Sequence, residues 1–453
     1  MTRRLHLNLF LMARGHHEAA WRHPDSVKHA LTDLDLYIEA AAIAEAAKFD
    51  AVFLADALVA SNNGAPGSTG TLEPLTVLSA LAARTRRIGL IGTASTTYSL
   101  PYTLARQFAS LDHLSQGRAG WNIVTSWLPL AGANYGLAED VSHSDRYAIA
   151  EEFVEAVDAL WRSFPADAIL DDRESGRFVD PSRVKPVNYA GSHVRTRGPL
   201  NVPASPQGRP VYVQAGQSET GRAFAGRWAE AIFTAHLTKE SARTFYGDVK
   251  GRAAAYGRRP NDILILPGIS AAIGSTKREA ERVWEELDAL TSADVGLSRL
   301  SARFGGHDFT SVPLDRRLTA GDFPDPEKVE ASKSRAMGYS DMAVREGLTL
   351  RQLLRKLAGA RGHFTATGTP EEVADVVEDW FRTGAADGFN VMPPIMHSQF
   401  TLFAEEVVPL LRKRGLFRED YEGATLRSHF GLRDVSEAPP LARSGTGKAA
   451  AVP

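Results

Sequence analysis

The sequence contains no cysteine. Disulfide bonds, thiolate metal ligands, iron–sulfur clusters and cysteine nucleophiles are therefore excluded, and the absence is consistent with a reducing compartment. Neither sign of charge dominates, because 52 lysine and arginine residues stand against 54 aspartate and glutamate residues. The resulting net charge of -2 gives no general attraction to nucleic acid or to anionic lipid.

Long hydrophobic runs are missing as well. No apolar stretch reaches the length of a transmembrane helix, and the first residues lack the apolar segment and the small-residue cleavage site of a signal peptide. We therefore expect a cytoplasmic protein that binds neither nucleic acid nor membrane.

Several common site motifs are incomplete. Residues 17–21 (HEAAW) begin like a zinc-protease helix but carry tryptophan where the second histidine ligand must stand, so we predict no metal site. Residues 444–448 (SGTGK) lack the glycine spacing of a phosphate loop. No G-x-G-x-x-G follows a predicted strand, so we expect no built-in site for a nicotinamide cofactor.

The 453 residues are 43% hydrophobic and 23% charged, as in globular proteins. Short apolar strands alternate with amphipathic helices, which is typical of a parallel sheet covered by helices. The predicted strands are Leu5–Met12, Ala51–Ala55, Ile88–Ala94, Gly120–Thr125, Val211–Gln214, Ala231–Thr234, Ile263–Ile269 and Gly388–Val391. Eight strands favour a (β/α)8 TIM barrel over an open doubly wound sheet.

A barrel needs only ~250 residues, so the excess must lie in insertions. We predict one TIM-barrel domain over residues 1–436, with insertions at about 164–208 and 291–369, and a flexible tail over 437–453. Long insertions at the catalytic end of a barrel usually form lids or substrate walls.

Polar residues follow several predicted strands, where barrels place their chemistry. Asp56 ends the second strand, where it could also be an ordinary helix cap. Hydroxyl side chains end the third strand over Thr93–Thr97. The fourth strand ends in Trp121–Trp127, which combines an amide, hydroxyls and two large rings and suits a flat, heteroatom-rich ligand, or else forms a packed aromatic edge.

Two helix starts could bind an anion. Arg146 and Tyr147 open one helix, although a normal helix cap explains part of that segment. The fifth strand runs into Gly216, Gln217 and Ser218, where small residues leave backbone N–H groups accessible to a phosphate; a tight turn is an equally good explanation. His16 and His17, near the end of the first strand, are the histidines best placed for proton transfer.

In this order and spacing, these segments resemble the bacterial luciferase-like flavin monooxygenases, within the group of nitrilotriacetate, dibenzothiophene-sulfone and long-chain alkane monooxygenases. The resemblance spans nearly the whole chain. The segments that carry it are Gly15-His16 with Trp21–Pro24, Lys48–Asp56, Ser95–Tyr98 with Pro101-Tyr102, Leu111–Ser115, Trp121–Ser126, Arg146-Tyr147, Gln214–Gly216 with Ser218 and Gly221-Arg222, and Ala386–Phe389.

The resemblance implies that the chain binds reduced FMN at the carboxyl ends of the barrel strands. It places the flavin ring near Ala55, Asp56, Ser95 and Asn122. It places the phosphate near Ser126, Tyr147, Gln217 and Ser218, which lie beside Arg146 and Gly216 in the sequence. Because FMNH2 is then a diffusible substrate, a separate NAD(P)H:flavin reductase is expected to supply it. The family usually forms homo-oligomers, so a homodimer or homotetramer is expected.

The implied chemistry is reaction of FMNH2 with O2 to a C4a-peroxyflavin, which transfers one oxygen atom to a small organic substrate and releases the other as water. His16 is the predicted proton-transfer residue. Phe10, Met12 and Trp127 are predicted to line the substrate pocket, with Trp127 where the alkane enzyme has a histidine, which makes an alkane substrate less favoured. Residues 295–298 and 313–315 resemble the sulfone-oxidising members and point to a heteroaromatic or organosulfur acceptor.

Three alternatives stay open. A deazaflavin-dependent oxidoreductase would share the barrel, and a flavin-binding protein without turnover would bind FMN without oxygen transfer. A barrel hydrolase ranks last, because no cysteine, metal cluster or nucleophile elbow supports it.

Overall fold

The computed structural model describes residues 3–29, 31–60, 71–126, 128, 130–325 and 333–435, and only the backbone of 333–335. Trp127 and the predicted tail lie outside the described residues. The strands are β1 (His6–Phe10), β2 (Ala51–Leu54), β3 (Gly89–Ser95), β4 (Ala119–Val124), β5 (Ile169–Asp172), β6 (Arg177–Val179), β7 (Tyr189–Ala190), β8 (Arg195–Thr196), β9 (Val211–Gln214), β10 (Ala231–Thr234), β11 (Leu264–Ile273), β12 (Phe364–Gly368) and β13 (Gly388–Val391).

The α-helices lie between and after these strands. They are α1 (Leu34–Ala46), α2 (Pro74–Arg84), α3 (Pro101–Leu114), α4 (His143–Arg162), α5 (Glu219–Trp228), α6 (Lys239–Ala255), α7 (Lys277–Ala289), α8 (Ala293–Arg303), α9 (Lys333–Arg345), α10 (Leu350–Ala360), α11 (Pro370–Arg382), α12 (Ser398–Leu402), α13 (Val408–Lys413) and α14 (Leu426–His429), with a π-helical segment Phe403–Val407 between α12 and α13. Among the described residues, every helix is too short or too polar to traverse a lipid bilayer.

Eight parallel strands close into a barrel. The neighbours run β1-β2-β3-β4-β9-β10-β11-β13, and β13 pairs back with β1. Leu9 of β1 shows the closure directly, because it pairs with Val52 on one side and with Val391 on the other. Every residue of β2, β9, β10 and β13 is buried, as expected for strands covered by helices outside and filled by side chains inside. The predicted TIM barrel and its eight strands are confirmed.

One strand differs from the sequence-based expectation. β11 continues to Ile273, beyond the predicted end at Ile269, and its second half pairs with β12, from Ile269 against Phe364 to Ile273 against Gly368. The sequence pattern assigns residues 364–368 to the second insertion. A short strand whose partner lies about ninety residues earlier leaves no local periodic signal, because only the pairing reveals it.

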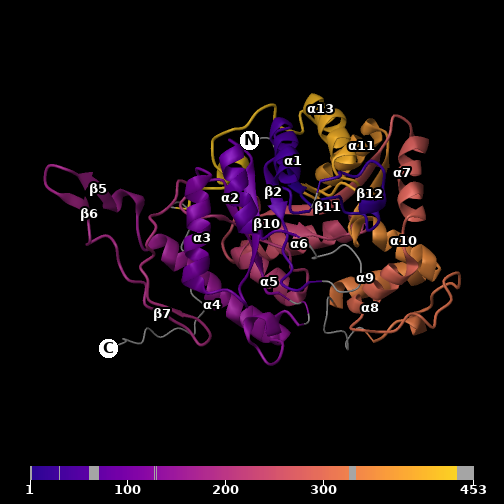
Figure 1. Cartoon of the computed structure of the whole chain (residues 1–453), viewed down its shortest axis with the longest axis horizontal. Helices are drawn as coiled ribbons and strands as arrows, with labels where there is room; N and C mark the ends of the chain where they lie inside the picture. Colours follow the sequence, from indigo (N-terminus) through magenta and orange to yellow (C-terminus); the bar gives the residue numbers. More distant parts are fainter. Residues whose placement is uncertain are drawn as a thin grey trace.

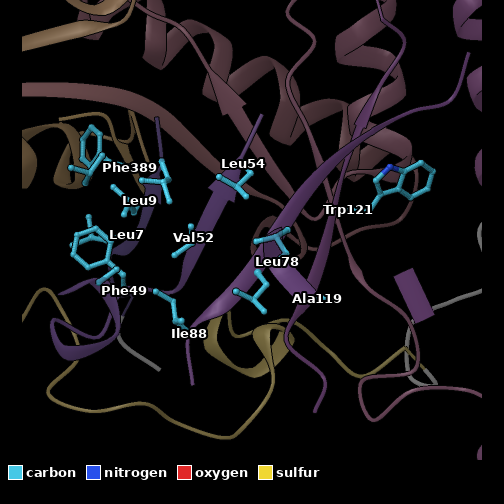
Figure 2. Close-up of a cluster of buried hydrophobic side chains, with 14 of the residues drawn as sticks. Leu7, Leu9, Phe49, Val52, Leu54, Leu78, Ile88, Ala119, Trp121 and Phe389 are labelled. Atoms are coloured by element: carbon cyan, nitrogen blue, oxygen red, sulfur yellow. The ribbon is translucent and has the colours of Figure 1, made fainter. Parts of the chain in front are cut away.

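Two hydrophobic layers hold the barrel. The outer layer, shown in Figure 2, packs strand residues such as Leu7, Leu9 and Val52 against helix residues such as Leu78 of α2. The inner layer fills the barrel and includes Phe10, whose ring lies 4.7 Å from that of Phe53 and 5.2 Å from that of Phe233. Successive side chains along a strand therefore point alternately to the outer and to the inner layer.

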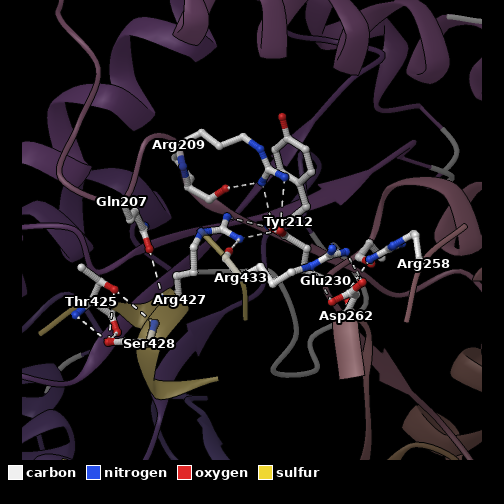
Figure 3. Close-up of polar contacts among 12 residues, drawn as sticks. Gln207, Arg209, Tyr212, Glu230, Arg258, Asp262, Thr425, Arg427, Ser428 and Arg433 are labelled. Atoms are coloured by element: carbon white, nitrogen blue, oxygen red, sulfur yellow. Dashed lines mark hydrogen bonds and ion pairs between the residues drawn. The ribbon is translucent and has the colours of Figure 1, made fainter. Parts of the chain in front are cut away.

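The amino-terminal end of the barrel is closed by α14. Leu426 belongs to the inner layer, and a Cβ atom at Gly89 would lie only 2.5 Å from its side chain, so glycine is needed there. Buried ion pairs surround α14 (Figure 3). Glu230 accepts hydrogen bonds from Arg209 at 2.8 Å and from Arg427 at 2.7 Å. The open, functional end must then be the carboxyl end of the strands.

Both predicted insertions carry secondary structure. Residues 164–208 include the β5–β6 hairpin, which projects at one side of the molecule in Figure 1. Residues 291–369 include α8, α9 and α10, gathered at the other side. The second insertion has its own small core, with Leu300, Phe309 and Leu353 among its buried members.

Candidate functional site

The ends of β3 and β4 meet through their hydroxyl groups. Ser126 donates a hydrogen bond of 2.8 Å to the Oγ atom of Ser95, which also accepts the backbone N–H groups of Thr97 and Tyr98 at 3.2 Å. Ser126 has a left-handed backbone with φ of 46°, which turns the chain immediately after β4. Two residues predicted for the site, Ser95 and Ser126, are thus in direct contact.

The first turn of α4 faces the start of α5. The Tyr147 hydroxyl forms hydrogen bonds with the side chains of Ser218 and Thr125, and burial raises the pKa of this phenol. Ser218 caps α5 by accepting the N–H of Gly221 at 3.1 Å. A Cβ atom at Gly216 or at Gly221 would lie 2.8 Å from the Tyr147 oxygen, so only glycine allows this approach. The phenol, two hydroxyls and a helix N-terminus therefore share one small space.

Arg146 lies next to this space in the sequence and is buried. Its Nη1 atom donates to the carbonyl oxygen of Val141 at 2.9 Å, which orients the guanidinium at the start of α4. Its charge acts on the Tyr147 phenol and lowers the pKa of that group, against the larger effect of burial. The helix N-terminus and this guanidinium give the space the electrostatic character of an anion site.

The side chain of Gln217 points toward β10. Its amide nitrogen donates to Thr234 Oγ1 at 2.8 Å and to the carbonyl oxygen of Ala235 at 2.9 Å. The side chain therefore ties the loop after β9 to the end of β10, and its place near a phosphate stays a prediction for the backbone of this loop.

Among the described residues, the buried side-chain oxygens Oδ1 of Asn122, which faces the barrel interior, and Oε1 of Gln214, which lies beside Gly216, have no hydrogen-bond partner. The amide nitrogen of Asn122 donates to Thr93 Oγ1 at 2.8 Å, so its oxygen is held in a fixed direction. A buried polar atom without a partner calls for an explanation, and a bound ligand is one. Together with the glycine-lined anion site, these atoms fit a ligand that has a polar ring system and a phosphate.

A cavity of about 460 Å3 lies between the ends of β1 and β2 and the second insertion. Four residues predicted for the site line it: Phe10, Met12, Ala55 and Asp56. The carboxylate of Asp56 accepts the N–H of Ala57 at 2.8 Å, and burial raises the pKa of this carboxyl group. The cavity has the size and the largely apolar wall of a small-molecule site.

Charged residues of the cavity were missed by sequence analysis. Glu18 forms an ion pair of 2.7 Å with Arg299 of α8, and both line the cavity. Arg303, one turn further along α8, and Arg361, which follows α10, also line it. The only signal in the sequence is the spacing of Arg299 and Arg303, which puts both on one helix face but does not say what that face meets.

His16 is fully buried behind this wall. Its Nε2 atom lies 2.8 Å from the carbonyl oxygen of Phe10, and its Nδ1 atom has no hydrogen-bond partner among the residues that the structure describes. Burial and the positive charge of Arg361 lower the pKa of His16 from 6.5 to about 3. The imidazole is therefore neutral at neutral pH.

The structure thus brings the predicted residues together in two neighbouring groups. Ser95, Asn122, Ser126, Tyr147 and Ser218 surround the ends of β3, β4 and β9. Phe10, Met12, Ala55 and Asp56 line the cavity at the ends of β1 and β2. Trp127, predicted for the substrate pocket, lies outside the described residues.

Comparison with known proteins supports one family. The profile of the luciferase-like monooxygenases matches residues 10–387. N-acetyl-S-(2-succino)cysteine monooxygenase of Bacillus subtilis is 46% identical over 95% of this chain and 97% of its own. Nitrilotriacetate monooxygenase component A of Aminobacter aminovorans is 42% identical, with the same two coverages of 95% and 97%. Dibenzothiophene-sulfone and long-chain alkane monooxygenases also match, so the group predicted from the sequence is confirmed.

Solved structures of related proteins have the same fold as this chain. Riboflavin lyase, crystallised with a modified FMN and riboflavin, has a TM-score of 0.84 and 33% identity over 95% of this chain and 96% of its own. A coenzyme F420-dependent reductase from Methanopyrus kandleri has a TM-score of 0.55 and only 17% identity, so its likeness extends to the fold alone.

Proposed function

Since the chain belongs to the luciferase-like monooxygenase family, we propose that it is the oxygenating component of a two-component system that uses reduced FMN and O2. As a member of this family it is a flavin-dependent monooxygenase. The observation that supports FMN most is the glycine-lined space between α4 and α5, together with the buried amide oxygens of Asn122 and Gln214, which have no hydrogen-bond partner in the part of the chain that the structure describes. Riboflavin lyase, whose structure contains a modified FMN, supports the same cofactor.

The residues divide between the two ends of FMN. Ser126, Tyr147 and Ser218, with the N-terminus of α5 and Arg146, would hold the phosphate by charge-assisted hydrogen bonds. Gly216 keeps the necessary space open, and the backbone of Gln217 belongs to the same loop. Ala55, Asp56, Ser95 and Asn122 would flank the ring.

Reduced FMN, when bound, supplies the two electrons that activate O2, so that one oxygen atom enters the substrate and the other leaves as water. The chain must position the acceptor in the cavity and exclude water from it. Phe10 and Met12 form part of the apolar wall that does so. His16 is the proposed proton-transfer residue. Its imidazole is neutral at neutral pH because its pKa is about 3, so it would take up a proton at Nδ1 only transiently.

The partner is proposed to be a separate NAD(P)H:flavin reductase. Nitrilotriacetate monooxygenase is named as a component A, and pristinamycin IIA synthase occurs as subunits A and B, both of which match this chain. A homodimer or homotetramer, a cytoplasmic location and the heteroaromatic or organosulfur nature of the acceptor remain predictions from the sequence.

The test is anaerobic titration of the full chain with FMNH2, followed by rapid mixing with O2 and recording of the flavin absorbance. We expect saturable FMNH2 binding and a transient species that lasts longer than the oxidation of free FMNH2. Binding with oxidation no slower than that of free flavin would favour a flavin carrier without turnover. Absence of FMNH2 binding would contradict the proposal and direct attention to a deazaflavin.

A further inference from the structure

The side chains at the end of β10 and the start of α6 form a chain of hydrogen bonds whose directions are fixed. Ser241 donates its only hydroxyl proton to the carbonyl oxygen of Thr238 at 3.1 Å. The hydroxyl oxygen of Ser241 also lies 3.0 Å from Nδ1 of His236, so it must accept a hydrogen bond from that nitrogen. The ring proton of His236 is therefore on Nδ1.

His236 presents its other ring nitrogen as an acceptor. The residue is 8% exposed, its ring centroid lies 5.1 Å from that of Phe245, and burial lowers its pKa from 6.5 to about 4. A neutral imidazole with its proton on Nδ1 can only accept at Nε2. That atom lies 2.6 Å from Oγ1 of Thr234, so the hydroxyl of Thr234 donates to it. His236 thus fixes the direction in which this hydroxyl points.

The chain of hydrogen bonds ends in the loop after β9. Because Thr234 gives its proton to His236, its oxygen is left to accept, and it accepts from the amide nitrogen of Gln217 at 2.8 Å. The same nitrogen donates to the carbonyl oxygen of Ala235 at 2.9 Å, so both of its protons are used. Hydrogen bonds that follow one another in this way polarise and strengthen each other. The side chain of Gln217 is therefore held against the end of β10.

Gln217 stands between Gly216 and Ser218, which the proposed function assigns to the FMN phosphate. The space beside this loop is narrow, because a Cβ atom at Gly216 would lie 2.8 Å from the hydroxyl oxygen of Tyr147. Backbone N–H groups bind an anion well only when they already have the right conformation, since ordering a loop during binding costs affinity. The anchoring of Gln217 supplies such order before the ligand arrives.

We propose that His236 is a positioning residue for FMN, which acts through Thr234 and Gln217 to hold residues 215–218 in the conformation that receives the phosphate. This inference rests on the proposed function, because that function places the phosphate beside this loop. The end of β10 and the start of α6 are thereby assigned a part in cofactor binding.

The experiment is fluorescence titration of the full chain with FMN and with riboflavin, which has no phosphate. His236→Leu removes the acceptor for Thr234 and should weaken FMN binding by about three- to tenfold, while riboflavin binding changes by less than about twofold. His236→Gln, whose amide oxygen can accept from Thr234, should keep FMN affinity within about twofold of wild type. His429→Leu is the matched control, because His429 is also buried, has a pKa of about 4 and lies in α14 at the opposite end of the barrel.

Thr234→Val interrupts the same chain of hydrogen bonds without changing the size of the side chain, and it replaces His236→Leu if that variant does not fold. The double variant should bind FMN no more weakly than either single variant, because both changes break one chain. Equal losses for FMN and riboflavin, or wild-type FMN affinity in both single variants, would overturn the inference while leaving the proposed function intact.

Hydrogen–deuterium exchange of the flavin-free protein separates the two proposals. Residues 215–218 should exchange faster in His236→Leu than in wild type, and the glutamine variant should restore the wild-type rate. If wild type does not bind FMN, the proposed function fails, and with it the assignment of His236 to FMN. The exchange rates then still decide whether His236 holds this loop, and rates unchanged in His236→Leu and Thr234→Val would overturn that as well.

Discussion

The Nε2 atom of His16 donates a hydrogen bond of 2.8 Å to the backbone carbonyl oxygen of Phe10. A carbonyl can only accept, so this contact places the proton on Nε2 and leaves Nδ1 as an acceptor, which has no partner in the described part of the chain. Phe10 in turn lines the cavity and touches Phe53 and Phe233 inside the barrel. The imidazole is therefore fixed directly behind the wall of the proposed acceptor site.

Replacing His16 by alanine should reduce the product formed per FMNH2 oxidised by at least about tenfold, because a positioned acid or base contributes on this scale. FMN binding should change by less than about twofold, since the phosphate site is elsewhere. The pH profile of kcat/KM should show no inflection from this residue between pH 5 and 8, because its pKa is about 3. His193→Ala, at an exposed position of the first insertion, is the control. Wild-type coupling in His16→Ala would remove this residue from the mechanism.

Tyr147→Phe should weaken FMN binding by about five- to tenfold, because it removes a hydroxyl that bonds Ser218 and Thr125 beside the proposed phosphate position. Riboflavin, which has no phosphate, should bind wild type and variant alike. Fluorescence titration with both flavins measures this difference. Tyr246→Phe removes a hydroxyl that donates to Asp387 at 2.9 Å, away from the site, and serves as the control. An equal loss for FMN and riboflavin would contradict the phosphate assignment.

Asp112→Asn should stabilise the protein more at pH 8 than at pH 5. Burial raises the pKa of Asp112 from 3.8 to about 6, so the folded state disfavours the charged carboxylate. The resulting cost grows as pH rises from about 4 to about 6 and is constant above, and the asparagine variant does not bear it. Its Oδ1 atom can still accept from Ala119 at 2.8 Å and from Gln207 at 2.7 Å. In urea unfolding, the difference in free energy of unfolding between the variant and the wild type should grow by about 1 kcal/mol from pH 5 to pH 8. A difference that does not change with pH would show that the raised pKa of Asp112 is not its cause.

Arg427→Met should lower the free energy of unfolding by about 3–5 kcal/mol, because it leaves the buried carboxylate of Glu230 with one guanidinium instead of two. The matched control is Arg278→Met, which breaks a pair with Glu285 of the same 2.7 Å distance but with both side chains more than half exposed. This exposed pair should contribute less than about 1 kcal/mol. Denaturant unfolding measures the free energy of unfolding of both variants. Equal losses would show that burial does not strengthen the ion pair at the amino-terminal end of the barrel.

The strands of the barrel were predictable because their signal is local. Ala51–Leu54 is a short apolar run, and Val211–Gln214 is a short run in which only the last residue is polar; both strands are buried throughout. The residues after these strands were predictable for the same reason. Since all parallel strands of a barrel end on one face, Ser95 and Ser126 had to meet once the strands were identified.

The partners of individual side chains were not predictable in this way. Gln217 lies in the expected loop, and its amide binds Thr234 and Ala235 at the end of the neighbouring strand. His16 lies at the expected strand end, yet full burial and the charge of Arg361 keep it neutral. Both outcomes depend on residues distant in the chain, and no periodic pattern reports such a distance.

The sequence by itself determined the barrel, the strand ends that carry polar groups, and the flavin monooxygenase family, because these follow from local hydrophobic patterns and from motifs in a fixed order. Only the tertiary structure decided how the cavity is built. It brings Arg299, Arg303 and Arg361 from an insertion to the ends of β1 and β2, which lie more than two hundred residues earlier in the chain. Charge and burial at a site depend on which surfaces meet, and that is determined by the packing of the whole chain.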